Sequence, residues 1–128
     1  MGRKFNIKVE CDFEYLWRYN ITLACEMCDA TGERIDYGYV ERRIGEIGCN
    51  MLHEPADWKN ESLELTTVEC DQIRLLLYVN PHTMPRERDV EALSPFQMRV
   101  RVTADRKRLY DKSHSVDQRG GTSVSIEL

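Results

Sequence analysis

Three cysteines and one histidine, arranged as two close pairs, are the clearest candidate for chemistry in this chain. Cys25 and Cys28 are separated by two residues, and Cys49 and His53 by three. Structural zinc sites take four such ligands, commonly as two close pairs. Chance spacing explains the same pattern, because Cys25 is expected at the end of a strand and Cys28 in the following turn. A zinc-stabilised domain is therefore kept as an alternative, and no cofactor is expected.

Aromatic side chains provide a second candidate site, for stacking against sugar rings. Trp17, Trp58, Tyr37 and Tyr39 have the flat faces that such stacking needs. The competing interpretation is that they pack over the ends of the core or stiffen strands, because a chain this small needs most of its aromatic residues inside. Carbohydrate binding is thus a second alternative.

Groups for acid–base or nucleophilic catalysis do not gather anywhere in the sequence. His53, His82 and His114 are scattered, and none lies next to a serine or cysteine in a known nucleophile motif. The chain also lacks a nucleophile elbow, a phosphate-binding glycine loop and a metalloprotease helix. We therefore expect that the protein is not an enzyme.

The segments that must position these residues alternate apolar and polar side chains. A period of two places successive side chains on opposite faces of a strand, so each segment has one buried face. The alternating apolar residues are Phe5, Ile7, Val9 and Cys11; Tyr19, Ile21, Leu23 and Cys25; Ile73, Leu75, Leu77 and Val79; Phe96, Met98, Val100 and Val102; and Val124, Ile126 and Leu128. The pattern predicts an all-β, antiparallel two-sheet β-sandwich of about eight strands. Ig-like, C2-like and transthyretin-like arrangements are not distinguished at this level.

Turn residues divide the chain into short connections and two long ones. The turn at 29–33 joins two strand patterns and predicts a β-hairpin over residues 19–44. Residues 45–61 form a long loop, and residues 85–94 are the only segment that favours a helix, of a few turns at most. The length of 128 residues fits a single sandwich domain over 1–128.

Charge and hydropathy narrow the classes of partner. A net charge of -4 argues against nucleic acid, whose phosphates attract basic proteins. No apolar run is long enough to cross a bilayer, so no membrane partner is expected. The N-terminus leads into a strand pattern without the apolar core of a signal peptide, which predicts a cytoplasmic protein. Removal of a leader peptide would instead place it in the periplasm or outside the cell.

One strand pattern is apolar on both of its faces. Leu76 and Tyr78 point away from the side that carries Leu75 and Leu77, and a second apolar face needs a cover. Arg99 and Arg101 alternate outward from another strand and form a candidate basic face. We therefore predict a non-catalytic binding or assembly module that acts through a surface. Its partner is another protein or a second copy of the chain, as in a homo-oligomer.

Overall fold

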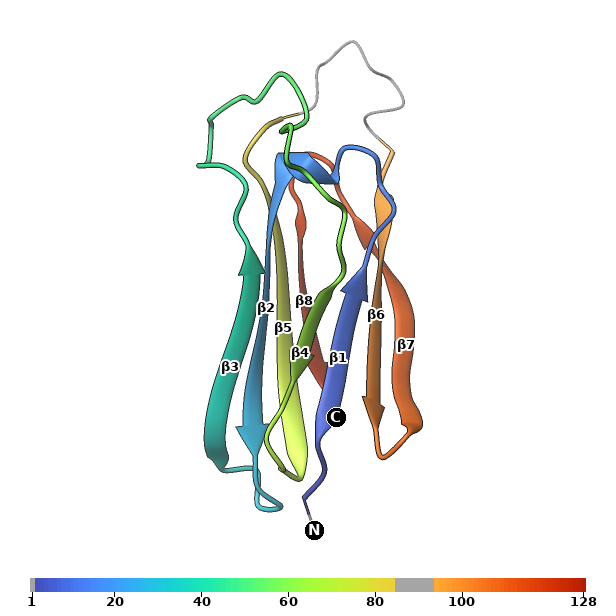
Figure 1. Cartoon of the computed structure of the whole chain (residues 1–128). Coiled ribbons are helices and arrows are strands. Elements are labelled where there is room, and N and C mark those ends of the chain that lie inside the picture. Colours follow the sequence, from blue (N-terminus) through green and yellow to red (C-terminus); the bar gives the residue numbers. More distant parts are fainter. Residues whose placement is uncertain (1, 85–93) are drawn as a thin grey trace.

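Two four-stranded antiparallel sheets face each other in this protein (Figure 1). The structure is a computed structural model that describes residues 2–84 and 94–128. The first sheet, here the 4-1-6-7 sheet, contains β4 (Leu63–Thr66), β1 (Phe5–Glu10), β6 (Phe96–Ala104) and β7 (Lys107–Val116) in that order. The second, the 3-2-5-8 sheet, contains β3 (Arg34–Arg42), β2 (Tyr19–Cys28), β5 (Gln72–Pro81) and β8 (Thr122–Glu127). The predicted antiparallel β-sandwich is confirmed.

The chain passes repeatedly from one sheet to the other. Among the strands that the structure describes, β2–β3 and β6–β7 are the hairpins within a sheet, and the other successive strands lie in opposite sheets. The β2–β3 hairpin confirms the one predicted over residues 19–44. Its turn is closed by the side chain of Asp29, which accepts hydrogen bonds from the backbone N–H groups of Thr31 and Glu33, while Gly32 takes the positive φ of 87°.

The core lies between the sheets and is made by the inward-facing phase of each strand. The period of two explains this, because every second residue of β1, β2, β5 and β6 is buried against the facing sheet. The most completely buried large side chains are Tyr19, Phe5, Ile7, Leu16, Leu23, Ile73, Leu75, Leu77 and Met98. These residues are the ones that the alternation places inside, apart from Leu16, which comes from the end of the sandwich.

A short 3-10 helix, η1 (Leu16–Arg18), closes the end of the sandwich from which the long loops emerge (Figure 1). Its Leu16 and Trp17 are buried, and the nearby ring of Phe13 stacks on Phe96 at a centroid distance of 4.2 Å. The short helix predicted near 85–94 falls on residues 85–93, which lie outside the described residues. Within 2–84 and 94–128, no helix has the length and apolar character needed to cross a membrane.

Candidate binding face

The outward side of the 3-2-5-8 sheet carries a group of exposed aromatic and aliphatic side chains. Strand register sets their order: Tyr39 lies opposite Ala24, and Ala24 lies opposite Leu76. Tyr37 lies two residues before Tyr39 on the same side of β3. Tyr78 lies two residues after Leu76 on the same side of β5. We call Tyr37, Tyr39, Ala24, Leu76 and Tyr78 the tyrosine face. The sequence placed Tyr37 and Tyr39 in one candidate site and Leu76 and Tyr78 in another, and the sheet brings these four residues onto one surface.

The three tyrosines of this face remain largely accessible to solvent. Tyr39 is 60% exposed, Tyr37 48% and Tyr78 38%, whereas Ala24 between them is buried by its larger neighbours. The rings of Tyr37 and Tyr39 lie 6.4 Å apart and are tilted by 41°. Flat sheets lack the concavity of a small-molecule site, so this surface suits a broad contact better than an enclosed ligand.

A charged row borders the tyrosine face at one end of the sheet. Arg74 on β5 lies between Glu26 on β2 and Glu127 on β8, with N–O distances of 3.7 and 3.9 Å. All three side chains are exposed enough that these ion pairs add little stability. An apolar, aromatic centre with a polar rim is the usual anatomy of a protein interface.

The two tryptophans of the predicted sugar platform lie elsewhere. Trp17 belongs to η1 and is only 5% exposed, so its face is not open to a sugar. Trp58 packs half-buried against the core, and the guanidinium of Arg42 lies 5.2 Å from the centre of its ring system. Of the four predicted stacking residues, only Tyr37 and Tyr39 come together, and their tilted rings do not form a flat platform.

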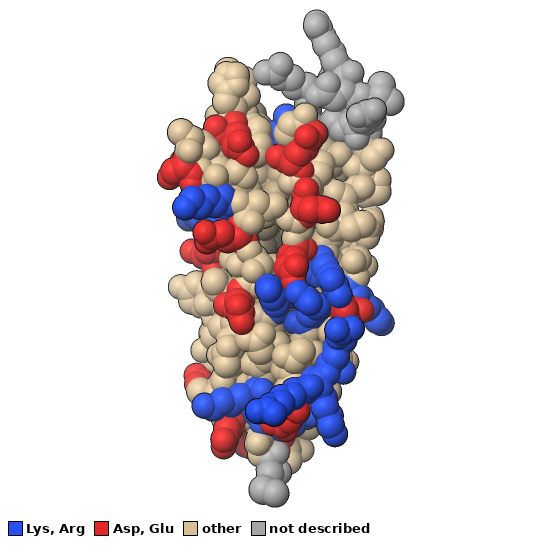
Figure 2. All heavy atoms as spheres, turned by 45° about the vertical axis from the view of Figure 1, so that its right-hand side comes forward, with Lys and Arg blue, Asp and Glu red and all other residues tan. Residues whose placement is uncertain are grey.

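Arg99 and Arg101 lie on the outward side of the other sheet, and both are paired. Arg99 donates two hydrogen bonds to Asp111 at 2.8 and 2.7 Å, and Arg101 donates to Glu10. Hydrogen bonding to Arg99 holds the pKa of Asp111 below its ordinary value. Figure 2 shows basic and acidic side chains side by side over this part of the molecule. Both arginines of the predicted basic face are therefore paired with acidic side chains, on the opposite sheet from Leu76 and Tyr78.

The structure does not bring the four predicted zinc ligands together. Cys28 lies at the end of β2 that pairs with Gln72, whereas Cys49 hydrogen-bonds to His82, just beyond the other end of β5. Ten residues of strand separate these ends, or about 30 Å. Among the described residues, no cluster of three or more such ligands could hold a metal ion.

Sequence reasoning missed the true neighbour of Cys49. His53 is four positions away and was paired with it by spacing, but the thiol lies 3.2 Å from Nδ1 of His82, which is 33 positions away. This contact arises because the loop over residues 43–62 packs against the end of β5. By contrast, Leu76 and Tyr78 of the tyrosine face had a sequence signal, since they occupy the strand phase expected to be polar.

Comparison with known proteins identifies a relationship of fold. No protein-family model matches the chain. No curated protein matches it. A crystal structure of a DUF4425 family protein from Bacteroides ovatus ATCC 8483 is similar to it, with a TM-score of 0.53 and 11% sequence identity over 100% of this chain and 94% of that one. At this level of identity, the similarity shows the fold alone.

Proposed function

We propose that the protein is a non-catalytic assembly module that binds a second copy of itself through the tyrosine face. The observation that carries this proposal is the contiguity of Tyr37, Tyr39, Leu76 and Tyr78 on one open sheet surface. Soluble chains rarely expose contiguous aromatic and aliphatic surface without a use for it. Covering this surface with another chain removes its apolar area from water.

The chemistry of the face favours a protein partner over a sugar. Tyrosine gives a large, rigid contact area with little loss of side-chain entropy, and serine hydroxyls adapt to a partner's polar groups. Ser123 and Ser125 on β8 lie beside Tyr78 and Leu76 in the same rows. A sugar-binding platform would instead need aligned rings, and the tryptophans that could supply them are buried or covered.

The arrangement of large and small residues is self-complementary. A two-fold axis parallel to the strands would place β3 of one copy over β8 of the other, because it reverses the strand order 3-2-5-8. Tyr39 would then lie over the second copy's Ser125, so the bulky side chains of β3 would face the small side chains of β8. In the charged row, Arg74 would face the second copy's Glu26. The two copies' surfaces are thus complementary in both shape and charge in one closed dimer.

Light scattering after size-exclusion chromatography, over a wide range of protein concentration, tests the proposal. Leu76→Asp places a charge at the centre of the face and should convert the dimer to a monomer. Gln97→Asp makes the same kind of change at an exposed position of β6 on the opposite sheet and should leave the dimer intact. A wild-type monomer at every concentration, or equal effects of the two variants, would refute the proposal.

We place this module in the cytoplasm. All five cysteines, each within the described residues, are free thiols. Reduced cysteines persist in the cytoplasm, where glutathione and thioredoxin keep them so. Alkylation of the protein in freshly lysed cells, followed by mass spectrometry, should find Cys49 modified as a thiol.

A further inference from the structure

A cysteine and a histidine meet at the loop end of the sandwich, away from the tyrosine face. Cys49 is exposed, and its Sγ lies 3.2 Å from Nδ1 of His82, which is 1% exposed. The other ring nitrogen, Nε2, lies 2.7 Å from the backbone carbonyl oxygen of Trp17. A carbonyl only accepts hydrogen bonds, so Nε2 carries the hydrogen and Nδ1 is an acceptor, with Oγ1 of Thr83 at 2.9 Å and the thiol of Cys49 at 3.2 Å.

The loop that carries Cys49 is fastened to the end of β5. Gly48 N–H donates to the carbonyl of His82 at 3.1 Å, and Met51 N–H donates to Oγ1 of Thr83 at 2.9 Å. Gly45 leaves the space that the pair needs, because a Cβ atom there would lie 2.8 Å from Sγ of Cys49 and 3.0 Å from Nδ1 of His82. The thiol is therefore held at the imidazole by contacts on both sides.

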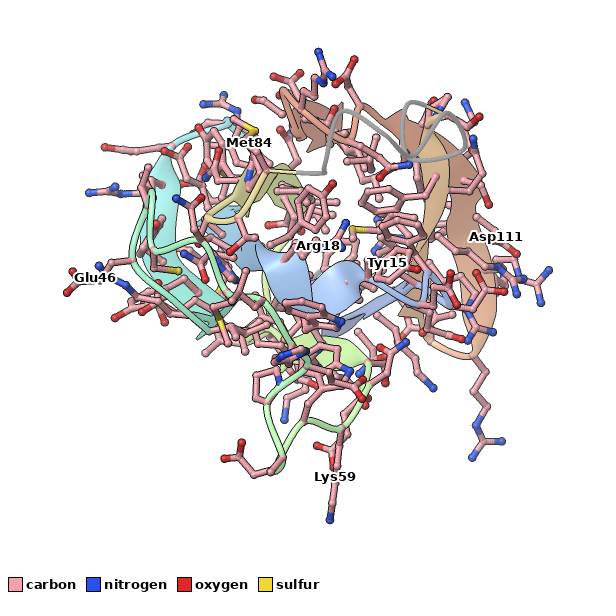
Figure 3. The ribbon with its side chains drawn as sticks, turned by 90° about the horizontal axis from the view of Figure 1, so that it is seen from above. Tyr15, Arg18, Glu46, Lys59, Met84 and Asp111 are labelled. Atoms are coloured by element: carbon pink, nitrogen blue, oxygen red, sulfur yellow. The ribbon has the colours of Figure 1, made fainter. Side chains whose placement is uncertain are left out.

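A cavity of about 480 Å³ lies next to Thr83, the neighbour of this pair, and its lining includes a guanidinium with two nitrogens that lack hydrogen-bond partners among the described residues. Its lining includes Thr83, whose Oγ1 is 3.8 Å from Sγ of Cys49, and Arg18 at the end of η1. Nε and Nη1 of Arg18 are buried and have no hydrogen-bond partner among the residues that the structure describes. Its guanidinium lies 4.2 Å from the ring centre of Tyr15, and Figure 3 shows the two side chains together at this end of the molecule. Buried donors without partners favour an anionic ligand.

We propose that Cys49 undergoes thiol–disulfide exchange with a small disulfide that carries a carboxylate, with His82 as the base and Arg18 as the carboxylate receptor. Nδ1 of His82 takes the proton of the thiol, and the sulfur of Cys49 attacks one sulfur of the disulfide. The disulfide bond breaks, and the departing thiolate recovers the proton from His82. The products are a mixed disulfide on Cys49 and one free small thiol, so the reagent's departing sulfur is reduced as Cys49 is oxidised.

Burial keeps the imidazole of His82 neutral near pH 7. It lowers the pKa of His82, so Nδ1 holds a lone pair that can accept a proton. The partly buried Cys11 provides an internal comparison, because desolvation raises the pKa of its thiol. We therefore expect Cys49 to react first of all the cysteines.

Two disulfide reagents test the proposal on the purified full chain. Dithiobis(nitrobenzoate) carries carboxylates, dipyridyl disulfide is neutral, and both release a coloured thiol that gives the rate. Peptide mass spectrometry should locate the first modification at Cys49. Gly45→Ala, which displaces the pair sterically, and His82→Gln, which removes the base, should each slow both reagents by about tenfold or more. Arg18→Gln should slow the carboxylate reagent about tenfold and leave the neutral one unchanged.

The outcomes separate the parts of the proposal. Modification of Cys11 as fast as Cys49, or wild-type rates in Gly45→Ala, would overturn the activated thiol even where His82→Gln does not fold. Equal slowing of both reagents by Arg18→Gln, or no slowing of either, would overturn the carboxylate receptor. Gln97→Asp should retain the wild-type rates, since Gln97 lies on an exposed position of β6 and takes no part in this chemistry.

Discussion

Tyr39 offers the sharpest quantitative test of the tyrosine face. A tyrosine presents about 200 Å² of surface, of which the 60% exposed here amounts to about 120 Å². Covering that area is worth about 3 kcal/mol at 25 cal/mol per Å², and fixing the side chain costs about 1 kcal/mol, which leaves about 2 kcal/mol. A two-fold dimer buries Tyr39 twice, so Tyr39→Ser should weaken association by about 4 kcal/mol, roughly a thousandfold in Kd.

Sedimentation equilibrium of wild type and Tyr39→Ser measures this difference directly. Tyr15→Ser is the matched control, because Tyr15 is also exposed but lies at the loop end beside η1. The control should dimerise like wild type, and the free energy of unfolding of both monomers should change little. A Tyr39→Ser dimer within threefold of the wild-type Kd would refute the placement of this side chain in the contact.

Two further predictions concern stability. Gly121→Ala should lower the free energy of unfolding by more than about 2 kcal/mol in urea denaturation, because Gly121 has φ of 69° and a Cβ atom there would clash with the carbonyl oxygen of Val79. Asp111→Asn should cost stability at neutral pH, and this cost should disappear on acidification. The pKa of Asp111 is lowered in the folded state by Arg99, so its stabilising effect is present above the unfolded pKa of about 4 and is lost as the pH falls through the folded value. Thermal melts of both proteins between neutral and acidic pH check the second prediction.

The fold was accessible to sequence reasoning because it is carried by a local signal. Alternation along β2, β5 and β6 identifies both the strand and its buried face without knowledge of any neighbour. Strand order is a different kind of information. The pairing of β1 with both β4 and β6 depends on which sheet each crossing connection reaches, and no single segment encodes that choice.

The candidate site was predicted in parts and assembled only by the structure. Leu76 and Tyr78 stood out because apolar side chains occupy the phase of β5 that should be polar, and Tyr37 and Tyr39 because they are aromatic. Their adjacency follows from the register of β3, β2 and β5, which the sequence does not state. The ion pair of Arg99 is not evident along its own strand for the same reason, since its partner Asp111 comes from the next strand.

The contact between Cys49 and His82 depends on a residue of the sheet and not on the loop's own sequence. Asn20, near the start of β2, accepts hydrogen bonds from the backbone N–H groups of Ile44 and Gly45 and donates one to the carbonyl of Gly45. This single side chain therefore holds Gly45 where its missing Cβ leaves room for the thiol and the imidazole. The sequence of residues 45–61 does not encode that constraint. For this reason the spacing favours the nearby His53 as the partner of Cys49, whereas the structure places His82 there. Chemistry at this end of the sandwich is set by the sheet that carries the loop.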